Sequence, residues 1–208
     1  MEKTSKDKQR SRMRGEERHA LILAETKKVF AEEGFRGAST GKLASACGIT
    51  EPILYKHFGS KKKLYIAVLT MIGEQFLERY QSMVEGRAER DLTDCLMNLL
   101  LDYRNAAMQD HAGLHLLMNA ALESSDPEVV ALAEKHDHEM YHLISGLLVK
   151  AQNLEILPRH LDLPVATWGY LSLLFALQYR AKASLFEEFN ERTIREINRL
   201  WLQSLRIG

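Results

Sequence analysis

Hydroxyl, imidazole and ammonium side chains gather in the segment Thr50–His57 and in the lysine run Lys61–Lys63 that follows it. Thr50, Tyr55 and His57 carry groups that hydrogen-bond to phosphates and reach base edges in a DNA groove. Lysines at the start of a helix add positive charge to the free amides there and make a phosphate site. The spacing favours contact with a nucleic acid, although a solvated basic face would show the same residues.

Two short helices are expected to hold these side chains. Ser39 can cap a helix over residues 40–46, Gly48 marks a turn, and a second short helix follows over residues 50–57. A longer helix over residues 16–33, with apolar residues at helical spacing, precedes them. Two short helices joined by a glycine-containing turn and braced by a longer one form a helix-turn-helix. In the second short helix we expect the following side chains to be buried: Ile53 or Leu54, and Phe58.

The rest of the chain also has helical periodicity, and alternating strand patterns are scarce, so we predict an all-α fold of about nine helices. Further helices are expected over residues 61–84, 91–109, 113–123, 127–152, 164–187 and 191–205. The predicted organisation is a disordered basic arm (1–15), a helix-turn-helix DNA-binding domain (16–63) and a larger helical domain (64–208).

Charge is divided unequally along the chain. Residues 1–63 hold 15 Lys or Arg and 8 Asp or Glu, whereas residues 64–208 hold 13 and 20, although the whole chain is neutral. A basic first part suits a polyanion and an acidic second part does not. There is no apolar run long enough to span a membrane and no secretory signal, and Cys47 and Cys95 match no metal or redox spacing. We therefore expect a cytoplasmic protein without a membrane partner.

Residues 18–69 resemble the DNA-binding domain of the TetR family of bacterial regulators. RHALILAETKKVFAEEGF is similar to the first helix of that domain and its glycine-aromatic end. STGKLASACGIT is similar to the second helix and turn, and EPILYKHFGSKKKLYIAVL to the recognition helix and the start of the fourth helix. The segment Leu54–Phe58 with Ser60 and Lys61 is the most specific part of the resemblance.

The resemblance implies DNA contacts at particular positions. Ala38 stands where the family often has Thr, and Lys63 stands where a Glu often completes a capping box with Ser60. The residues expected to contact the operator are Thr40, Gly41, Thr50, Glu51, Pro52, Tyr55, Lys56, His57 and Lys61.

The resemblance also implies that residues 64–208 form a ligand-binding and dimerisation domain. The last two helices would form a homodimer, which would pair two recognition helices on a near-palindromic operator. The expected interface residues are Leu174, Gln178, Leu185, Ile194, Ile197, Trp201 and Leu205, unless these stripes pack within one chain. The middle helices are expected to enclose a pocket for an unidentified small-molecule effector, with no other cofactor. The candidate lining residues, for each of which ordinary core packing is an alternative, are Tyr103, Met108, Met118, Tyr141 and Trp168.

Two pairs of histidines at i, i+4 spacing, His111/His115 and His138/His142, raise the alternative of a metal-responsive regulator. The Glu139–His142 segment fits the Glu-x-x-His pattern of metal-binding helical bundles once, without the second copy that a di-iron enzyme needs. No P-loop, dinucleotide fingerprint or nucleophile elbow occurs, so we predict no enzyme. A non-specific DNA-packaging protein would need basic residues throughout the chain. The sequence favours a DNA-binding transcriptional regulator, a repressor that a ligand releases from its operator.

Overall fold

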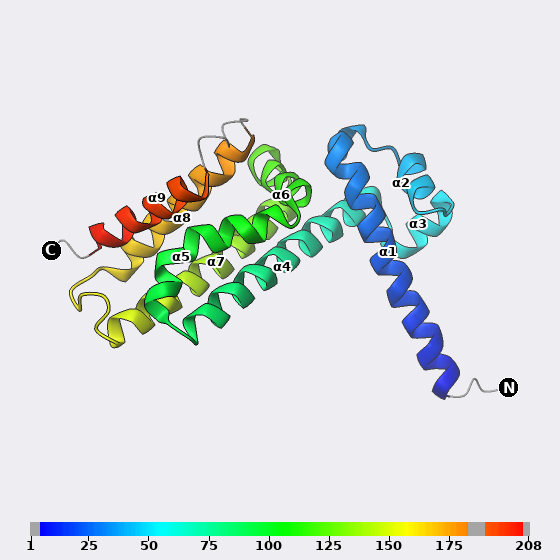
Figure 1. Ribbon diagram of the computed structural model, residues 1–208. Helices are drawn as coiled ribbons and strands as arrows, with labels where there is room; N and C mark the ends of the chain where they lie inside the picture. The colour runs from blue at the N-terminus through cyan, green and yellow to red at the C-terminus, as the bar shows by residue number, and fades with distance from the viewer. Residues whose placement is uncertain (1–4, 183–189, 206–208) are drawn as a thin grey trace. The chain divides into compact units, whose positions relative to one another are not determined.

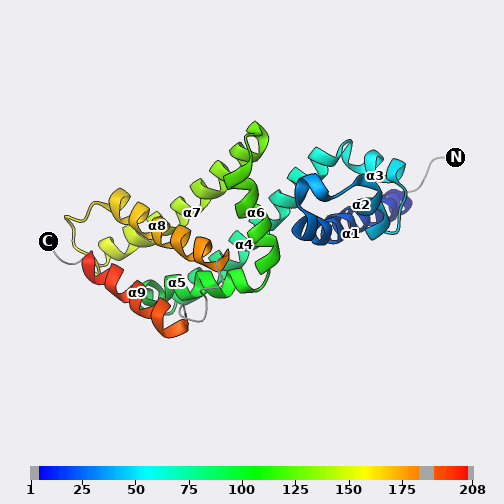
Figure 2. The same cartoon turned by 90° about the horizontal axis from the view of Figure 1, so that it is seen from above.

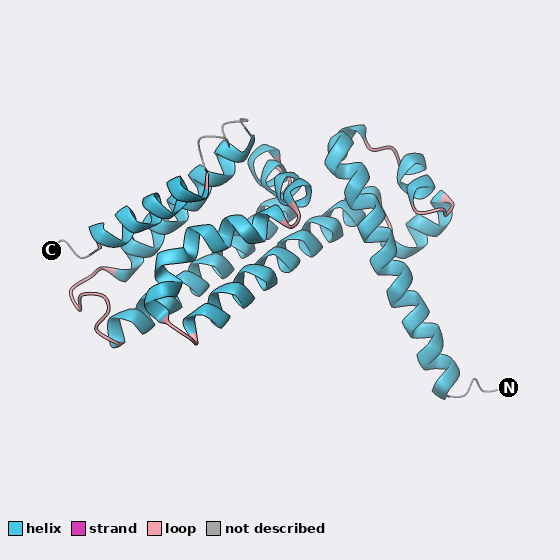
Figure 3. Cartoon of the chain, in the orientation of Figure 1, coloured by secondary structure: helices cyan, strands magenta, loops and turns pink. Residues whose placement is uncertain are grey.

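The computed structural model describes residues 5–182 and 190–205, and the side chains of residues 15–177 and 190–205. Within these residues the chain consists of helices joined by loops and turns, without a strand (Figure 1, Figure 3). The helices are α1 (Ser5–Gly37), α2 (Thr40–Ala46), α3 (Glu51–Phe58), α4 (Lys61–Ala88), α5 (Leu92–Met108), α6 (His111–Glu123), α7 (Pro127–Asn153), α8 (Leu163–Lys182) and α9 (Glu191–Ser204). The all-α prediction is confirmed. The predicted end of the eighth helix at residue 187 lies outside the described residues.

The chain divides into two compact units, Met1–Ile72 (unit 1) and Gly73–Gly208 (unit 2). The sequence placed this boundary at residues 63/64. The difference arises because α4 is continuous across the division and no helix-stop residue marks it. Tyr65, near the start of α4, packs in unit 1 against Phe30 and Phe35, with ring centroids 4.9 Å apart in both pairs.

Helix α1 differs from the prediction at its start. It begins at Ser5, so residues 5–15 are helical and do not form the expected disordered arm. The Lys, Arg, Gln and Met residues of this stretch have high helix propensity, and a helix can extend through them without an apolar stripe. At its other end α1 continues to Gly37, but Gly34, the expected stop, leaves helical geometry with a φ of 67° and divides the helix there.

Helix capping fixes the short elements of unit 1. The Lys42 amide donates to Ser39 Oγ at 3.3 Å, and the Lys63 amide donates to Ser60 Oγ at 3.1 Å. Thr50 occupies the N-cap position of α3, but its side chain makes no capping bond. Gly48, with a φ of 63°, makes the turn after α2 that the sequence predicted.

In unit 2, α5 packs against α9, α6 and α7, and α8 packs against α7 and α6 (Figure 2). Buried polar contacts join several of these helices. Asn198 of α9 donates from Nδ2 to the Leu96 carbonyl of α5 at 2.8 Å and accepts from the Leu100 amide at 3.1 Å. Asn198 is 1% exposed, so its amide group replaces water for two backbone groups of α5. None of the helices that the structure describes has the length and apolar character needed to cross a membrane.

We expect Asn198→Ala to lower the free energy of unfolding by about 1–3 kcal/mol, because two buried partners lose their hydrogen bonds. Urea denaturation measures this change. Gln203→Ala, an exposed position on the same helix, is the control and should change the midpoint little. Equal destabilisation by the two substitutions would show that Asn198 does not hold α9 to α5.

Candidate functional site

Helix α3 has one buried side and one exposed side. Leu54 is 2% exposed and Phe58 is 8% exposed, whereas Ile53 is on the surface. The prediction of a buried Phe58 is confirmed, and Leu54 is the second buried residue. The ring of His19 from α1 stacks on Phe58 with centroids 4.5 Å apart. Lys56 is exposed on the opposite side, and Tyr55, at the border between the two sides, is 41% exposed.

The start of α2 meets the start of α3 through one hydrogen bond. Thr40 Oγ1 donates to Glu51 Oε2 at 2.7 Å. A Cβ placed on Gly41 would lie 3.3 Å from Glu51 Oε1, so the Glu51 carboxylate lies against two residues of the predicted site. Thr50 and Pro52 are exposed beside it. The structure therefore brings these five predicted residues together.

The remaining candidates lie at the end of α3 and the start of α4. Lys56 is exposed, and His57 is partly buried with its ring centroid 6.4 Å from that of Phe58. Lys61 Nζ lies 4.6 Å from the centroid of the Phe35 ring. This cation–π contact holds the ammonium at the N-terminus of α4. The sequence did not lead us to expect this role for Phe35, although its position as an aromatic residue directly after Gly34 was the available signal.

Unit 2 contains a cavity of about 380 Å³ between α5, α6, α7 and α8. Three of the five predicted lining residues are present: Tyr103, Met118 and Trp168. Met108 is not in the lining and is 55% exposed. Tyr141 is not in the lining either, but its ring packs 5.5 Å from that of Trp168. The described lining residues are Tyr103, Leu117, Met118, Ala121, Leu122, Ala133, His136, Asp137, Met140, Trp168, Leu171, Ser172, Leu174 and Phe175.

Two ionisable neighbours on α7 line this cavity. Burial lowers the pKa of His136, against the opposing charges of Asp137 and Glu139. Desolvation raises the pKa of Asp137, and the two flanking histidines oppose that shift. The sequence reasoning missed His136. His136 lies four residues before the buried Met140 on α7, and this helical spacing was the signal that it faces the interior.

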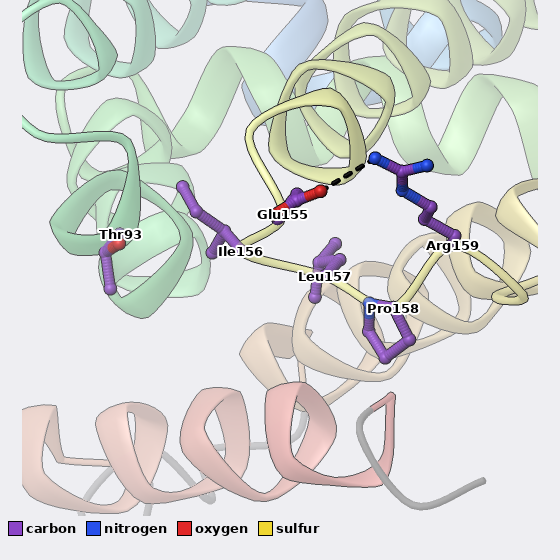
Figure 4. Close-up of a pocket in the computed structure, with 6 residues that line it drawn as sticks. All are labelled: Thr93, Glu155, Ile156, Leu157, Pro158 and Arg159. Atoms are coloured by element: carbon purple, nitrogen blue, oxygen red, sulfur yellow. Dashed lines mark hydrogen bonds and ion pairs between the residues drawn. The ribbon is translucent and has the colours of Figure 1, made fainter.

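A second hollow of about 690 Å³ lies where α5 begins and α7 ends (Figure 4). Its residues include Thr93 and the Glu155–Leu157 loop. Two of its lining residues, Arg159 and Glu155, are mostly exposed and form an ion pair of 2.7 Å. It contains no aromatic residue and none of the predicted site residues, so the cavity at His136 is the stronger candidate for a ligand.

The two histidine pairs do not gather further ligands. The rings of His111 and His115 stack with centroids 6.3 Å apart, and His115 Nδ1 lies 3.3 Å from Asn119 Nδ2. His138 and His142 are exposed on α7. Throughout the described part of the chain, no group of three or more His, Cys, Asp or Glu residues could hold a metal ion.

The predicted dimer stripe is largely core. Ile194 is 0% exposed, and Leu174 and Trp201 are also buried within the single chain, so these three offer little surface to a partner. The reason is that α9 packs against α5 of the same chain. Ile197 and Leu205 are partly buried, while Leu185 and the side chain of Gln178 lie outside the described residues. The large apolar side chains that α8 and α9 do expose are Val165, Trp168, Phe175 and Leu200.

The N-terminal part of the chain matches a known family. Residues 22–68 match the family model described as bacterial regulatory proteins, tetR family. This range runs from α1 into α4 and includes the whole of α2 and α3. The match therefore covers the helices that carry the predicted DNA contacts.

Individual relatives extend this likeness. The HTH-type transcriptional activator FasR of Mycolicibacterium smegmatis is 37% identical over 59 residues, which are 28% of this chain and 27% of FasR. The matched part thus spans about a quarter of the length of FasR. The HTH-type transcriptional repressor AcnR of Corynebacterium efficiens is 26% identical over 162 residues, which are 74% of this chain and 79% of AcnR.

A solved structure shares the fold of most of the chain. The crystal structure of the transcriptional regulator FadR from Bacillus subtilis in complex with stearoyl-CoA matches with a TM-score of 0.68 at 17% identity. The match covers 91% of this chain and 98% of FadR. At this identity the comparison shows a common fold.

The lowered pKa of His136 predicts that stability falls below about pH 6.5. The unfolded chain binds a proton there that the folded chain does not, so His136 contributes full stability above this pH and less as pH falls. The slope from one such group is at most about 1.4 kcal/mol per pH unit. Urea unfolding at pH 7.5, 6.5 and 5.5 should show a weaker pH dependence in His136→Gln than in the wild type. His160→Gln, at an exposed position, should keep the wild-type dependence; an unchanged dependence in His136→Gln would contradict the prediction.

Proposed function

We propose that this chain is a sequence-specific DNA-binding transcriptional regulator, because residues 22–68 match the family model of bacterial regulatory proteins, tetR family. In the specific version of this proposal, the protein is a homodimeric repressor that a small molecule releases from its operator. The observation that carries the proposal is the exposed side of α3, where Tyr55 and Lys56 project from a helix whose other side is buried. The relatives include an activator and a repressor, and both are of the HTH type.

In this proposal α3 enters the major groove and α4 meets the backbone. Tyr55 and the residues at the tip of α3 contact bases and the adjoining backbone. Lys61 binds a phosphate together with the free amides at the start of α4. Thr40 donates its hydroxyl to Glu51 in the structure, so a phosphate contact from Thr40 requires that bond to be exchanged.

The dimer is proposed to form through the exposed side of α8 and the neighbouring part of α9. Val165, Trp168 and Phe175 on α8 are 66%, 59% and 51% exposed, and they recur at helical spacing. Leu200 on α9 is 54% exposed. Apolar side chains of this size on one surface mark an interaction site. A two-fold dimer would present two copies of α3 to a near-palindromic operator.

The cavity is proposed to hold the effector, and α4 to transmit its binding. A Cβ placed on Gly73 of α4 would lie 3.5 Å from Leu117 and 3.6 Å from His136 Nδ1, both of which line the cavity. The ring of Phe76, one turn further along α4, lies 5.9 Å from that of His136. A ligand that displaces His136 therefore presses on α4, the helix that begins with Lys61. The ligand lowers DNA affinity by the same factor by which DNA lowers the affinity of the protein for the ligand.

We expect Tyr55→Ala and Lys61→Ala each to weaken operator binding by about tenfold, the effect of losing one contact of 1–2 kcal/mol. Lys61→Ala should also reduce the slope of log affinity against log salt by about one unit, because one phosphate contact is lost. Fluorescence anisotropy with operator DNA at several salt concentrations measures both quantities.

The control is Lys150→Ala, which removes an exposed lysine of α7 in unit 2 and should change neither quantity. Circular dichroism melting checks that each variant is folded. Wild-type operator affinity in both Tyr55→Ala and Lys61→Ala would exclude α3 and the start of α4 as the DNA-binding surface.

For the dimer, we expect Val165→Asp combined with Leu200→Asp to shift the protein to a monomer in sedimentation velocity experiments. Two carboxylates per chain would be buried without partners at the proposed interface, which costs several kcal/mol. Leu154→Asp, at a position that is 59% exposed but on neither α8 nor α9, should leave the sedimentation coefficient unchanged. A dimer that survives the double substitution would place the interface elsewhere.

A further inference from the structure

We infer that the cavity lined by His136 and Asp137 takes a lipophilic cation: a molecule with an aromatic or apolar body and one organic positive charge. The inference deepens the proposed function, since it gives the chemical class of the effector for the same cavity. Three features of the lining support it, namely its charge, its aromatic rings and its size.

The first feature is an unbalanced carboxylate. Among the described lining residues Asp137 is the one carboxylate, and none is Lys or Arg. Asp137 has no hydrogen bond or ion pair with any described residue. The lysine two positions earlier on α7, Lys135, lies instead 3.6 Å from Glu139 and 4.0 Å from Glu74. The adjacent His136 does not supply the missing charge either, because burial favours its neutral form.

Asp137 is exposed in the single chain, yet partial burial raises its pKa, so its surroundings do not fully replace water for the charged form. A bound cation would offset that desolvation and attract the carboxylate directly. A bound anion would add repulsion and find no cationic partner in the described lining.

The second feature is the aromatic content. Tyr103, Trp168 and Phe175 line the cavity, and Tyr141 packs behind Trp168. Aromatic faces attract organic cations through the ring quadrupole, and Trp is the strongest of them. Trp168 and Phe175 are more than half exposed in the single chain, and both also lie on the side of α8 proposed to face the dimer partner.

The third feature is size. A volume of about 380 Å³ is near the lower end of the range for small-molecule pockets, which is roughly 300–1,000 Å³. Apart from His136 and Asp137, the polar side chains of the described lining are Tyr103 and Ser172. The cavity therefore suits a compact, mainly apolar body with its charge beside Asp137.

The test uses two probes of almost the same shape and opposite charge, tetraphenylphosphonium and tetraphenylborate, in sodium buffer. Binding to the full-length protein is followed by the fluorescence of Trp168, with Trp168→Phe identifying the signal from this cavity. We expect the phosphonium to bind at least about tenfold more tightly than the borate. Equal or tighter binding of the borate would overturn the inference.

Variants of Asp137 locate the charge that selects the cation. Asp137→Asn should weaken phosphonium binding by about tenfold without weakening borate binding, and Asp137→Glu should keep the selectivity. Glu134→Gln is the matched control, because Glu134 is an exposed carboxylate on the same helix that does not line the cavity. The same loss of phosphonium binding in Glu134→Gln as in Asp137→Asn would show a general charge effect and overturn the inference.

Operator binding, measured on the same preparations without probe, separates this inference from the proposed function. A protein that binds its operator but prefers the borate refutes the cation and leaves the regulator intact. A protein that prefers the phosphonium but binds no DNA sequence selectively supports the cation site and refutes the regulator.

Discussion

The burial of two side chains on α3 is the constraint on which the candidate DNA interface depends. A helix of the length of Glu51–Phe58 is unstable alone in water, because helix nucleation costs more than two turns of hydrogen bonds return. Leu54 and Phe58 supply the missing stabilisation by packing in unit 1, where His19 of α1 covers the Phe58 ring. Once these two positions are inward, the 100° step of the helix turns Lys56 outward and places Tyr55 at the border of the exposed side. The chemistry of the exposed side thus follows from the packing of the buried side.

Unit 2 is organised by a different interaction, the buried polar contact. Arg87 of α4 donates from Nε and Nη2 to the two carboxylate oxygens of Asp102 on α5, at 2.8 and 2.9 Å, and Asp102 is 1% exposed. Tyr80 of α4 and Tyr170 of α8 share a hydrogen bond of 2.8 Å between fully buried hydroxyls, and burial raises the pKa of both. Each contact requires particular atoms to meet, so it fixes the register of its helices, which apolar packing alone leaves looser. The cavity beside α4 is held open between helices that these contacts fix in place.

The sequence predicted the helices of unit 1 well because their ends have local causes. Ser39, Gly48 and Ser60 act through atoms a few residues away, and that chemistry can be read along the chain. The same local rules could not identify what the stripe of Ile194 and Trp201 packs against. An amphipathic helix shows which side is buried, but not whether the covering surface belongs to the same chain. Here α5 covers it, and the exposed apolar side chains lie at other positions of α8 and α9.

The ligand cavity was harder to predict than the DNA interface for a related reason. His136 was overlooked in favour of the i, i+4 histidine pairs, because its importance comes from burial against Phe76 of another helix and not from its spacing. The long-range charge pattern, in contrast, can be read from sequence. Residues 64–72 contain no charged side chain, so unit 1 keeps 15 basic against 8 acidic residues and unit 2 keeps 13 against 20. The field of each unit therefore suits a ligand of opposite sign, DNA for unit 1 and a cation for unit 2. A cationic effector would be concentrated near the acidic unit without competing with the lysines of α4 for phosphate, so its action on DNA binding would have to pass through the structure.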